Sequence, residues 1–305
     1  MQPRAKRWIK YFKMEWPLHV MLLPPVVLII IYNYIPMYGT ILAFEKYLPS
    51  AMFASPWVGF DNFRKLFSMP GFLDVIRNTL AIAGGKIILG IAVPVIVSVM
   101  LNELRNVHVK RTVQTIIYMP YFVSWVLMAA IIIRMLSQFG IVNYVLLSLG
   151  IIKEPILYLL KPDLFPGLMI ATETWKSFGY GTVIYLATLA GINPDLYEAA
   201  SIDGAGRWRQ TWHVTLPGLV PIVALISCLN LSGIFNAGFD QIFNLYNPNV
   251  YSTGDIIDTY LYRMAFKSNQ ISISTAAGLF KSAISFVLIA VSYRVAYKIS
   301  GYRVI

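Results

Sequence analysis

Few residues of this 305-residue chain have the types and spacing that catalysis requires. The chain contains three histidines and one cysteine, Cys228, which lies in an apolar run and cannot form a disulfide within the chain. His213 has no nucleophile or acid–base partner at motif spacing, and the sequence shows no Cys/His metal cluster. The carboxylates that an intramembrane enzyme would need, Glu154, Asp255 and Asp258, are scattered. We therefore predict no catalytic residue and no metal site.

A polar stretch, YEAASIDGAGRWRQTWHVTLPG at 197–218, separates two apolar runs. The residue pattern predicts, in chain order, a helix start at Asn193-Pro194-Asp195, a short helix over 196–201, a turn at Asp203-Gly204, a second short helix over 207–214 and a new helix from Leu216-Pro217. Ala199 and Ala200 are small enough to let another surface approach closely. An interfacial helix anchored by Trp208 and Trp212 is the structural alternative.

Polar side chains inside apolar runs form the second group of candidates, because burying them in a membrane is costly. The candidates for a substrate path are Lys86, Thr172, Trp175, Lys176, Tyr180, Asn230, Ser232, Asn236, Asp240 and Lys281. Their spacing places several of them in stripes on single helix faces, and the aromatic rings, with Tyr185, could stack on sugar faces. The alternative is that these side chains hydrogen-bond neighbouring helices, which use the same residue types.

The three lysines of this group are the most unusual. Each lies in the outer half of its apolar run, where snorkelling explains Lys281 better than Lys176. One hypothesis is that one or more of them face a translocation path and favour an anionic substrate, such as a uronate-bearing oligosaccharide. The alternative is a structural ion pair, with Asp240 as a candidate partner.

Composition indicates a membrane protein. Hydrophobic residues make up 57% of the chain, charged residues 13%, and the mean hydropathy is +0.64. Several apolar runs reach the roughly 18 residues needed to cross a bilayer. The net charge of +11 comes mainly from residues at the ends of these runs, a pattern typical of membrane topology and not of nucleic-acid binding.

We expect an all-α integral membrane protein with six transmembrane helices. The predicted spans are 18–43, 78–102, 112–135, 166–190, 216–240 and 275–299. Prolines 24, 25, 94 and 120 within them predict kinks. Residues 1–17 form a basic cytoplasmic N-terminus, and residues 18–305 form the transmembrane domain. The first span is expected to be a retained signal anchor.

Lysine and arginine set the predicted orientation. Basic residues are concentrated before the first span, in the 103–111 connection and at the C-terminus, so both termini are expected in the cytoplasm. The longer 44–77, 136–165 and 241–274 connections then lie outside. Residues 191–215 fall on the cytoplasmic side, between spans four and five.

The 197–218 stretch also has the spacing of a known signature. Glu198-Ala199-Ala200 is followed after three residues by Gly204 and later by Val214 and Leu216-Pro217. This spacing resembles the EAA signature of permease subunits of type I ABC importers, with Val214 where the family often has Ile. The resemblance implies a coupling helix that sits in a groove of a separate ATPase, with Glu198 facing that ATPase and Gly204 at the turn. The expected coupling residues are Glu198, Ala199, Ala200, Asp203, Gly204, Arg207, Leu216 and Pro217.

The resemblance extends over most of the chain. Pieces such as YNYIPMYGTILAF, WVGFDNFRKLF and LYNPNVYSTGDIIDTYLYR look like the LplB-type branch of carbohydrate-importer permeases. It implies a bacterial plasma-membrane subunit that passes oligosaccharides from an extracytoplasmic binding protein into the cytoplasm, beside a second, related permease. The chain has no Walker A sequence, so ATP and magnesium are expected on a partner ATPase dimer and no cofactor on this chain.

Three other readings compete with an importer of acidic oligosaccharides. A permease for neutral oligosaccharides is the nearest alternative. An intramembrane enzyme would need clustered carboxylates or histidines. A secondary transporter would need paired broken helices or ion sites in internal repeats, and the sequence shows neither.

Overall fold

Helices are the dominant regular structure in the described part of the chain. The computed structural model describes residues 4–50 and 55–300, with side chains over 15–50 and 55–294. In these ranges the single β-type pairing is an isolated bridge between Glu45 and Trp57, and no strand is present. The expected all-α fold is confirmed.

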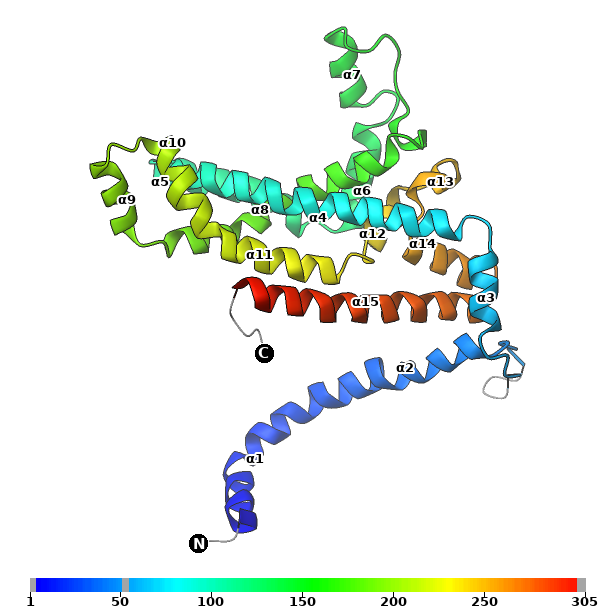
Figure 1. Ribbon diagram of the computed structural model, residues 1–305. Coiled ribbons are helices and arrows are strands. Elements are labelled where there is room, and N and C mark those ends of the chain that lie inside the picture. The colour runs from blue at the N-terminus through cyan, green and yellow to red at the C-terminus, as the bar shows by residue number, and fades with distance from the viewer. Residues whose placement is uncertain (1–3, 51–54, 301–305) are drawn as a thin grey trace.

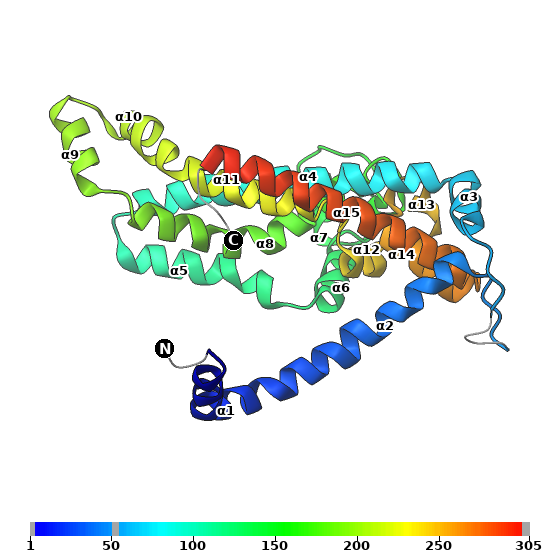
Figure 2. The same cartoon turned by 60° about the horizontal axis from the view of Figure 1, so that its bottom comes forward.

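Four long helices, grouped side by side, form the body of the molecule (Figures 1 and 2). They are α4 (Phe72–Glu103), α8 (Phe165–Ala190), α11 (Leu216–Ser232) and α15 (Ile271–Ser300). A separate arm, whose N-terminal half diverges from the body, consists of α1 (Arg4–Ile29), the π-helical turn Ile30–Tyr34, α2 (Ile35–Met37) and the 3-10 segment Tyr38–Phe44.

Shorter helices connect these elements. They are α3 (Asp61–Ser68), α5 (Val107–Tyr118), α6 (Trp125–Met135), α7 (Ile141–Ser148), α9 (Pro194–Ile202), α10 (Arg207–Gln210), α12 (Phe239–Leu245), α13 (Tyr251–Gly254) and α14 (Ile257–Tyr262). Figure 1 shows α7 standing away from the body.

Four helices in the described residues are long and apolar enough to cross a membrane, and a bent helix pair makes a fifth candidate. The four cover Glu15–Phe44, Phe72–Glu103, Arg207–Ser232 and Ile271–Arg294. The protein is therefore a multi-pass membrane protein. Helix α8 is not in this group; it carries Glu173 and Lys176 and packs along α4. The count of six spans stays a prediction.

The predicted third span is not one straight helix. The chain bends by 103° between α5 and α6, which are separated by a 3-10 turn over Met119–Phe122. Pro120 lies in this turn and lacks the N–H that a continuous helix needs, and the Ser124 side chain accepts a hydrogen bond from the Leu127 N–H and starts α6. The kink expected at Pro120 is thus a full break.

The predicted helix over 216–240 is wrong at both ends. It begins earlier, because α10 runs through a π-helical turn (Thr211–Thr215) into α11, so Leu216-Pro217 continues a helix and does not start one. It ends at Ser232, and residues 233–238 are non-helical up to Gly238, whose φ of +91° suits glycine.

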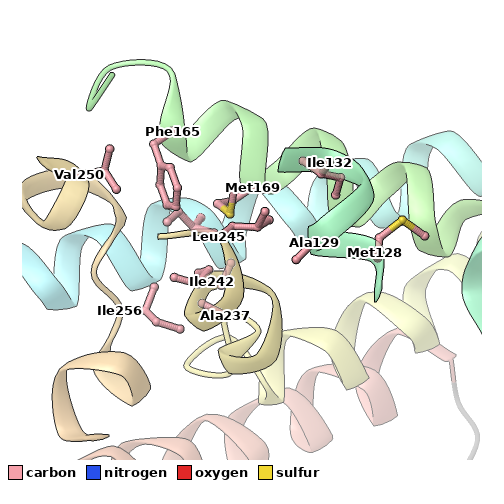
Figure 3. Packing of buried hydrophobic residues seen from close by; sticks show 12 residues of the cluster. Met128, Ala129, Ile132, Phe165, Met169, Ala237, Ile242, Leu245, Val250 and Ile256 are labelled. Carbon is pink, nitrogen blue, oxygen red and sulfur yellow. The ribbon is translucent and has the colours of Figure 1, made fainter. Parts of the chain in front are cut away.

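The main apolar core lies around α6 and α12, the short helices that follow the two helix breaks. Figure 3 shows Phe165 and Met169 of α8 beside Ile242 of α12, with Ala129 of α6 nearby. Phe165, Met169 and Ile242 are fully buried. The short helices α6 and α12 are thus held in place by packing against α8 and not by their own length.

The connections gather at two opposite ends of the body. Helices α9 and α10 lie at one end, and α3, α13 and α14 lie at the other, in both views (Figures 1 and 2). This alternation fits the predicted topology, in which 191–215 is on one side and 44–77 and 241–274 are on the opposite side. Which end is cytoplasmic stays a prediction.

Helix α8 approaches the α5 end so closely that it needs glycine. A Cβ atom built on Gly179 would lie 1.9 Å from the Ile117 carbonyl oxygen, a backbone atom, whereas a Cβ on Gly84 of α4 meets nothing within 4 Å. We predict that Gly179→Ala destabilises the protein by about 1–3 kcal/mol, as overpacking does. Gly84→Ala is the matched control and should melt like the wild type. Thermal unfolding of the purified protein measures both, and equal melting of the two variants would contradict the packing described here.

Candidate functional site

A cavity of about 510 Å³ lies between α4, α8, α11 and the non-helical 233–238 segment. Four of the predicted path residues line it: Lys86, Tyr180, Asn230 and Asn236. Tyr185 lines it as well, and Glu173 and Ser177 add polar groups. Only some of the polar residues predicted to share a helix face therefore line this cavity.

Aromatic rings form one wall of this cavity. Tyr121, from the break between α5 and α6, stacks on Tyr180 of α8 with ring centroids 4.1 Å apart and planes 7° from parallel. Phe122 meets the same Tyr180 ring edge-on. The Tyr185 hydroxyl is buried and has no hydrogen-bond partner among the described residues. Flat apolar faces beside hydroxyl groups suit a hydroxyl-rich ligand such as a sugar.

Lys86 is almost buried at the cavity wall. Its ammonium donates hydrogen bonds to the Ala237 carbonyl at 2.6 Å and to the Gln241 side-chain oxygen. The Glu173 carboxylate lies 3.9 Å away. Sequence reasoning missed Glu173 and Gln241, although a carboxylate within a predicted span, three residues before Lys176, was a usable signal.

Lys176 lies outside the cavity lining. Its side chain is buried, and its ammonium donates to the Tyr121 carbonyl at 2.8 Å and lies over the rings of Tyr121 and Trp125. Because the carbonyl belongs to the broken span, Lys176 ties α8 to the break.

Four more predicted path residues do not line the cavity. Thr172 accepts a hydrogen bond from Gln241 and donates to the Leu168 carbonyl. Ser232 donates to the Leu229 carbonyl at the end of α11. The Trp175 and Asp240 side chains are exposed on other faces of the isolated chain. The structure therefore links Thr172 to Lys86 only through Gln241, and it does not bring the other three residues together with Lys86 and Tyr180.

Lys281 lines a second cavity of about 490 Å³, together with Asp258, Asn236, Ser282 and Ser285. Its ammonium lies 2.5 Å from the Asp258 carboxylate. Ion pairing, the alternative considered for these lysines, is thus present for Lys86 and Lys281, but Asp240 is not the partner of either. The acidic partners are Asp258 for Lys281 and Glu173 for Lys86, because folding of the 241–274 connection and the packing of α4 on α8 bring these groups together.

The remaining carboxylates do not form a catalytic cluster. Asp255 pairs with Arg263 at 2.5 Å and accepts a hydrogen bond from Thr259, while Asp258 is taken by Lys281. Burial raises the pKa of Asp255, against the opposing influence of the Thr259 hydroxyl and the Arg263 guanidinium. Among the described residues, no group of three or more His, Cys, Asp and Glu side chains is placed to hold a metal ion.

The predicted coupling segment, residues 191–215, projects from one end of the body (Figure 2). Asn193 caps α9 by accepting a hydrogen bond from the Asp195 N–H, and Gly204 turns the chain with a φ of +76°. Glu198 and Ala199 are exposed, and Ala200 is half-buried. The first helix and the turn thus lie where the sequence predicts them, with the acidic residue free to meet another surface.

Side-chain contacts make this segment rigid. The Tyr197 and Thr215 hydroxyls lie 3.1 Å apart, and the Gln210 amide donates to the Ser201 hydroxyl at 2.8 Å. Arg207 lies 3.6 Å from the Glu103 carboxylate at the end of α4. The exposed Trp208 and Trp212 rings meet edge to face. Motion of the segment can therefore reach α11 through the continuous helix from Arg207.

Residues 86–301 match the protein family described as "Binding-protein-dependent transport system inner membrane component". This match covers more than half of the chain, including both cavities and the coupling segment. The chain belongs to this family. It is a permease component and not an enzyme, as the resemblance in the sequence implies.

Relatives of this permease share most of its length. Protein LplB of Bacillus subtilis is 37% identical over 92% of this chain and 89% of that protein. The polygalacturonan/rhamnogalacturonan transport system permease protein YteP of the same organism is 35% identical over 97% of this chain and 92% of that protein.

A solved structure is also similar along nearly the whole chain. It is described as a bacterial ABC transporter involved in the import of the acidic polysaccharide alginate, and it aligns with a TM-score of 0.88 and 35% identity over 96% of this permease and 99% of the matched chain. A second structure, of a bacterial alginate ABC transporter in complex with alginate pentasaccharide-bound periplasmic protein, aligns with a TM-score of 0.86.

We predict that Lys176→Met weakens the permease without changing which substrates it accepts. The substitution leaves the part-buried Tyr121 carbonyl without this charged donor, a loss of about 1–3 kcal/mol. We expect a lower melting temperature of the purified protein and equal fractional losses of uptake for acidic and neutral oligosaccharides. Loss of acidic uptake alone would show that Lys176 meets the substrate charge.

Proposed function

We propose that this chain is a transmembrane permease subunit of an ATP-driven importer that carries acidic oligosaccharides into the cytoplasm. The observation that carries the proposal is the 35% identity, over nearly the whole chain, to both YteP and the alginate importer permease. The polymers named for these two proteins, polygalacturonan, rhamnogalacturonan and alginate, all contain uronate residues. The aromatic and polar cavity of this chain suits a sugar of this kind.

Import of neutral oligosaccharides is the second candidate. The lactose permease protein LacF of Rhizobium radiobacter is 29% identical over 68% of this chain, and the arabinooligosaccharide permease protein AraP of Bacillus subtilis is 28% identical over 86%. Both identities are lower and the aligned shares are smaller than for YteP. These differences favour the acidic class.

The proposed assembly has three kinds of protein partner. A substrate-loaded binding protein docks on the outer connections, and a second, related permease completes the path. An ATPase dimer binds ATP and magnesium and receives the coupling segment in its groove. Closure of the ATPase pair then moves α9 to α11 as a body and switches access to the cavities. We also propose that both chain termini lie on the cytoplasmic side, as does the end of the body that carries α9.

Energy coupling is assigned to the exposed face of α9. Glu198 and Ala199 present a carboxylate and a small side chain on a helix that Asn193 caps and Gln210 braces. The apolar side chains of Leu196 and Ile202 are also exposed on this short helix. Exposed apolar side chains among carboxylates suit contact with a protein groove better than contact with water.

We predict that Glu198→Arg lowers uptake at least tenfold, on the order expected for reversing a charge in an interface, while ATP hydrolysis continues. Uptake and ATPase activity are measured on the assembled transporter in proteoliposomes. Glu15→Arg makes the same charge change on an exposed residue of the arm and should transport like the wild type. Normal transport by Glu198→Arg would remove this residue from the coupling surface.

We predict that the assembled transporter takes up uronate-containing oligosaccharides at least tenfold faster than neutral ones of the same length. Lys281 is the candidate residue for this preference for acidic substrates, because it lines the second cavity and forms an ion pair with Asp258. Lys281→Met leaves the Asp258 carboxylate unpaired, so it should reduce acidic uptake more than neutral uptake.

Asp258→Asn is the matched control for Lys281→Met, since it removes the opposite charge of the same pair. It should favour acidic substrates relative to the wild type. Faster uptake of neutral oligosaccharides by the wild type would replace the acidic proposal with the neutral one.

A further inference from the structure

The non-helical 233–238 segment separates helices α11 and α12 and lies next to both cavities. A break of this kind frees backbone carbonyls and N–H groups that a bilayer cannot satisfy, so protein or enclosed water must satisfy them. The Asn236 N–H donates to the Gly233 carbonyl at 2.7 Å within the segment. The Ala237 carbonyl is bound from outside the segment, by Lys86.

The Lys86 ammonium joins three elements at this point. It comes from α4, donates to the Ala237 carbonyl of the segment and to the Gln241 side-chain oxygen of α12, and faces Glu173 of α8 at 3.9 Å. A lysine has three N–H donors and no acceptor. Two of the N–H groups donate to the segment and to α12. The Glu173 carboxylate of the same chain lies 3.9 Å from the ammonium.

Gln241 completes the attachment on the other side. Its amide nitrogen donates to the Met169 carbonyl and to the Thr172 hydroxyl, both at 2.8 Å and both on α8. The Gln241 side chain is fully buried. Lys86 and Gln241 together therefore fix the end of the segment to α4 and α8 by five polar contacts.

Gly238 leaves the space that this arrangement needs. A Cβ atom at this position would lie 2.8 Å from the Lys86 ammonium, and the φ of +91° is unfavourable for other residues. The glycine therefore serves both the turn and the approach of the lysine.

The 233–238 segment is also part of the boundary between the two cavities. Asn236 lines the first cavity with Lys86 and Tyr180, and it lines the second with Lys281 and Asp258. A shift of this segment would change the shape of both cavities together.

We propose that Lys86 is a positioning residue: its ammonium holds the 233–238 segment against α4 and α8 and thereby sets the wall that the two cavities share. Its charge serves the Ala237 carbonyl, Gln241 and Glu173, and not the substrate. The consequence for transport rests on the proposed importer function, whereas the holding role can be tested without transport.

The test measures how accessible the segment is in the assembled transporter. Cys228 is the single cysteine of the chain, so a Cys228→Ser, Asn236→Cys background carries one reporter thiol. The rate of its reaction with a water-soluble maleimide is followed by mass spectrometry of the modified peptide. We expect Lys86→Met to raise this rate at least threefold, because the segment loses its outside donor.

Two further variants separate holding from charge and folding effects. Gln241→Leu keeps the lysine charge but removes its side-chain acceptor, so it should raise the labelling rate too. Gln241→Leu can also be measured by itself if the Lys86→Met variant does not assemble. Lys176→Met is the matched control, since it removes a buried lysine that binds Tyr121 and not this segment, and its labelling rate should equal the background. Unchanged labelling in both Lys86→Met and Gln241→Leu would overturn the proposal.

Uptake gives an independent readout in the chain with its natural Cys228 and Asn236. A positioning role predicts that Lys86→Met lowers acidic and neutral uptake by the same factor. Loss confined to acidic substrates would show that the ammonium binds substrate and would overturn the proposal. If the wild-type assembly imports no oligosaccharide, the proposed function fails, while the labelling rates still decide the role of Lys86.

Discussion

Satisfying backbone carbonyls at helix breaks is the constraint on which this structure depends. A membrane interior offers no water for groups that leave a helix, so each break must be matched by a donor from another element. The described part of the chain has two such breaks, at 119–124 and at 233–238, and in each a lysine from a continuous helix supplies the donor. Lys176 of α8 binds the Tyr121 carbonyl, and Lys86 of α4 binds the Ala237 carbonyl.

These two contacts explain why a cavity forms between long helices that would otherwise pack closely. Each break carries side chains into the space beside α8, Tyr121 from one and Asn236 from the other. The Lys86 ammonium next to Glu173 makes that wall nearly balanced in charge, and the Tyr121–Tyr180 stack makes part of it flat and apolar. Polar hydroxyl-rich molecules fit such a surface without leaving buried charges unpaired.

The end of the body that carries α9 and α10 is organised differently. Helix α10 continues through a π-helical turn into α11, so the second half of the coupling segment and an apolar span form one rod. The turn has a local cause: Pro217 has no N–H to offer the His213 carbonyl, which disturbs the regular helix hydrogen bonds. This rod ends at the 233–238 segment, so the predicted ATPase contact on α9 is joined to the cavity wall through the Gly204 turn and the rod.

Local and one-dimensional signals were sufficient to predict the all-α membrane class, the family and the structure of the first half of the coupling segment. These signals are apolar run length, the Asn193 cap, the Gly204 turn and the spacing from Glu198 to Pro217. The folded structure was needed to show which acceptor each lysine meets, that Asp240 has no part in those pairs, and that helices break at 119–124 and 233–238. Run length and hydropathy look the same for a straight and a broken span, because the difference lies in donors supplied by residues up to 151 positions away, as in the Lys86–Ala237 bond.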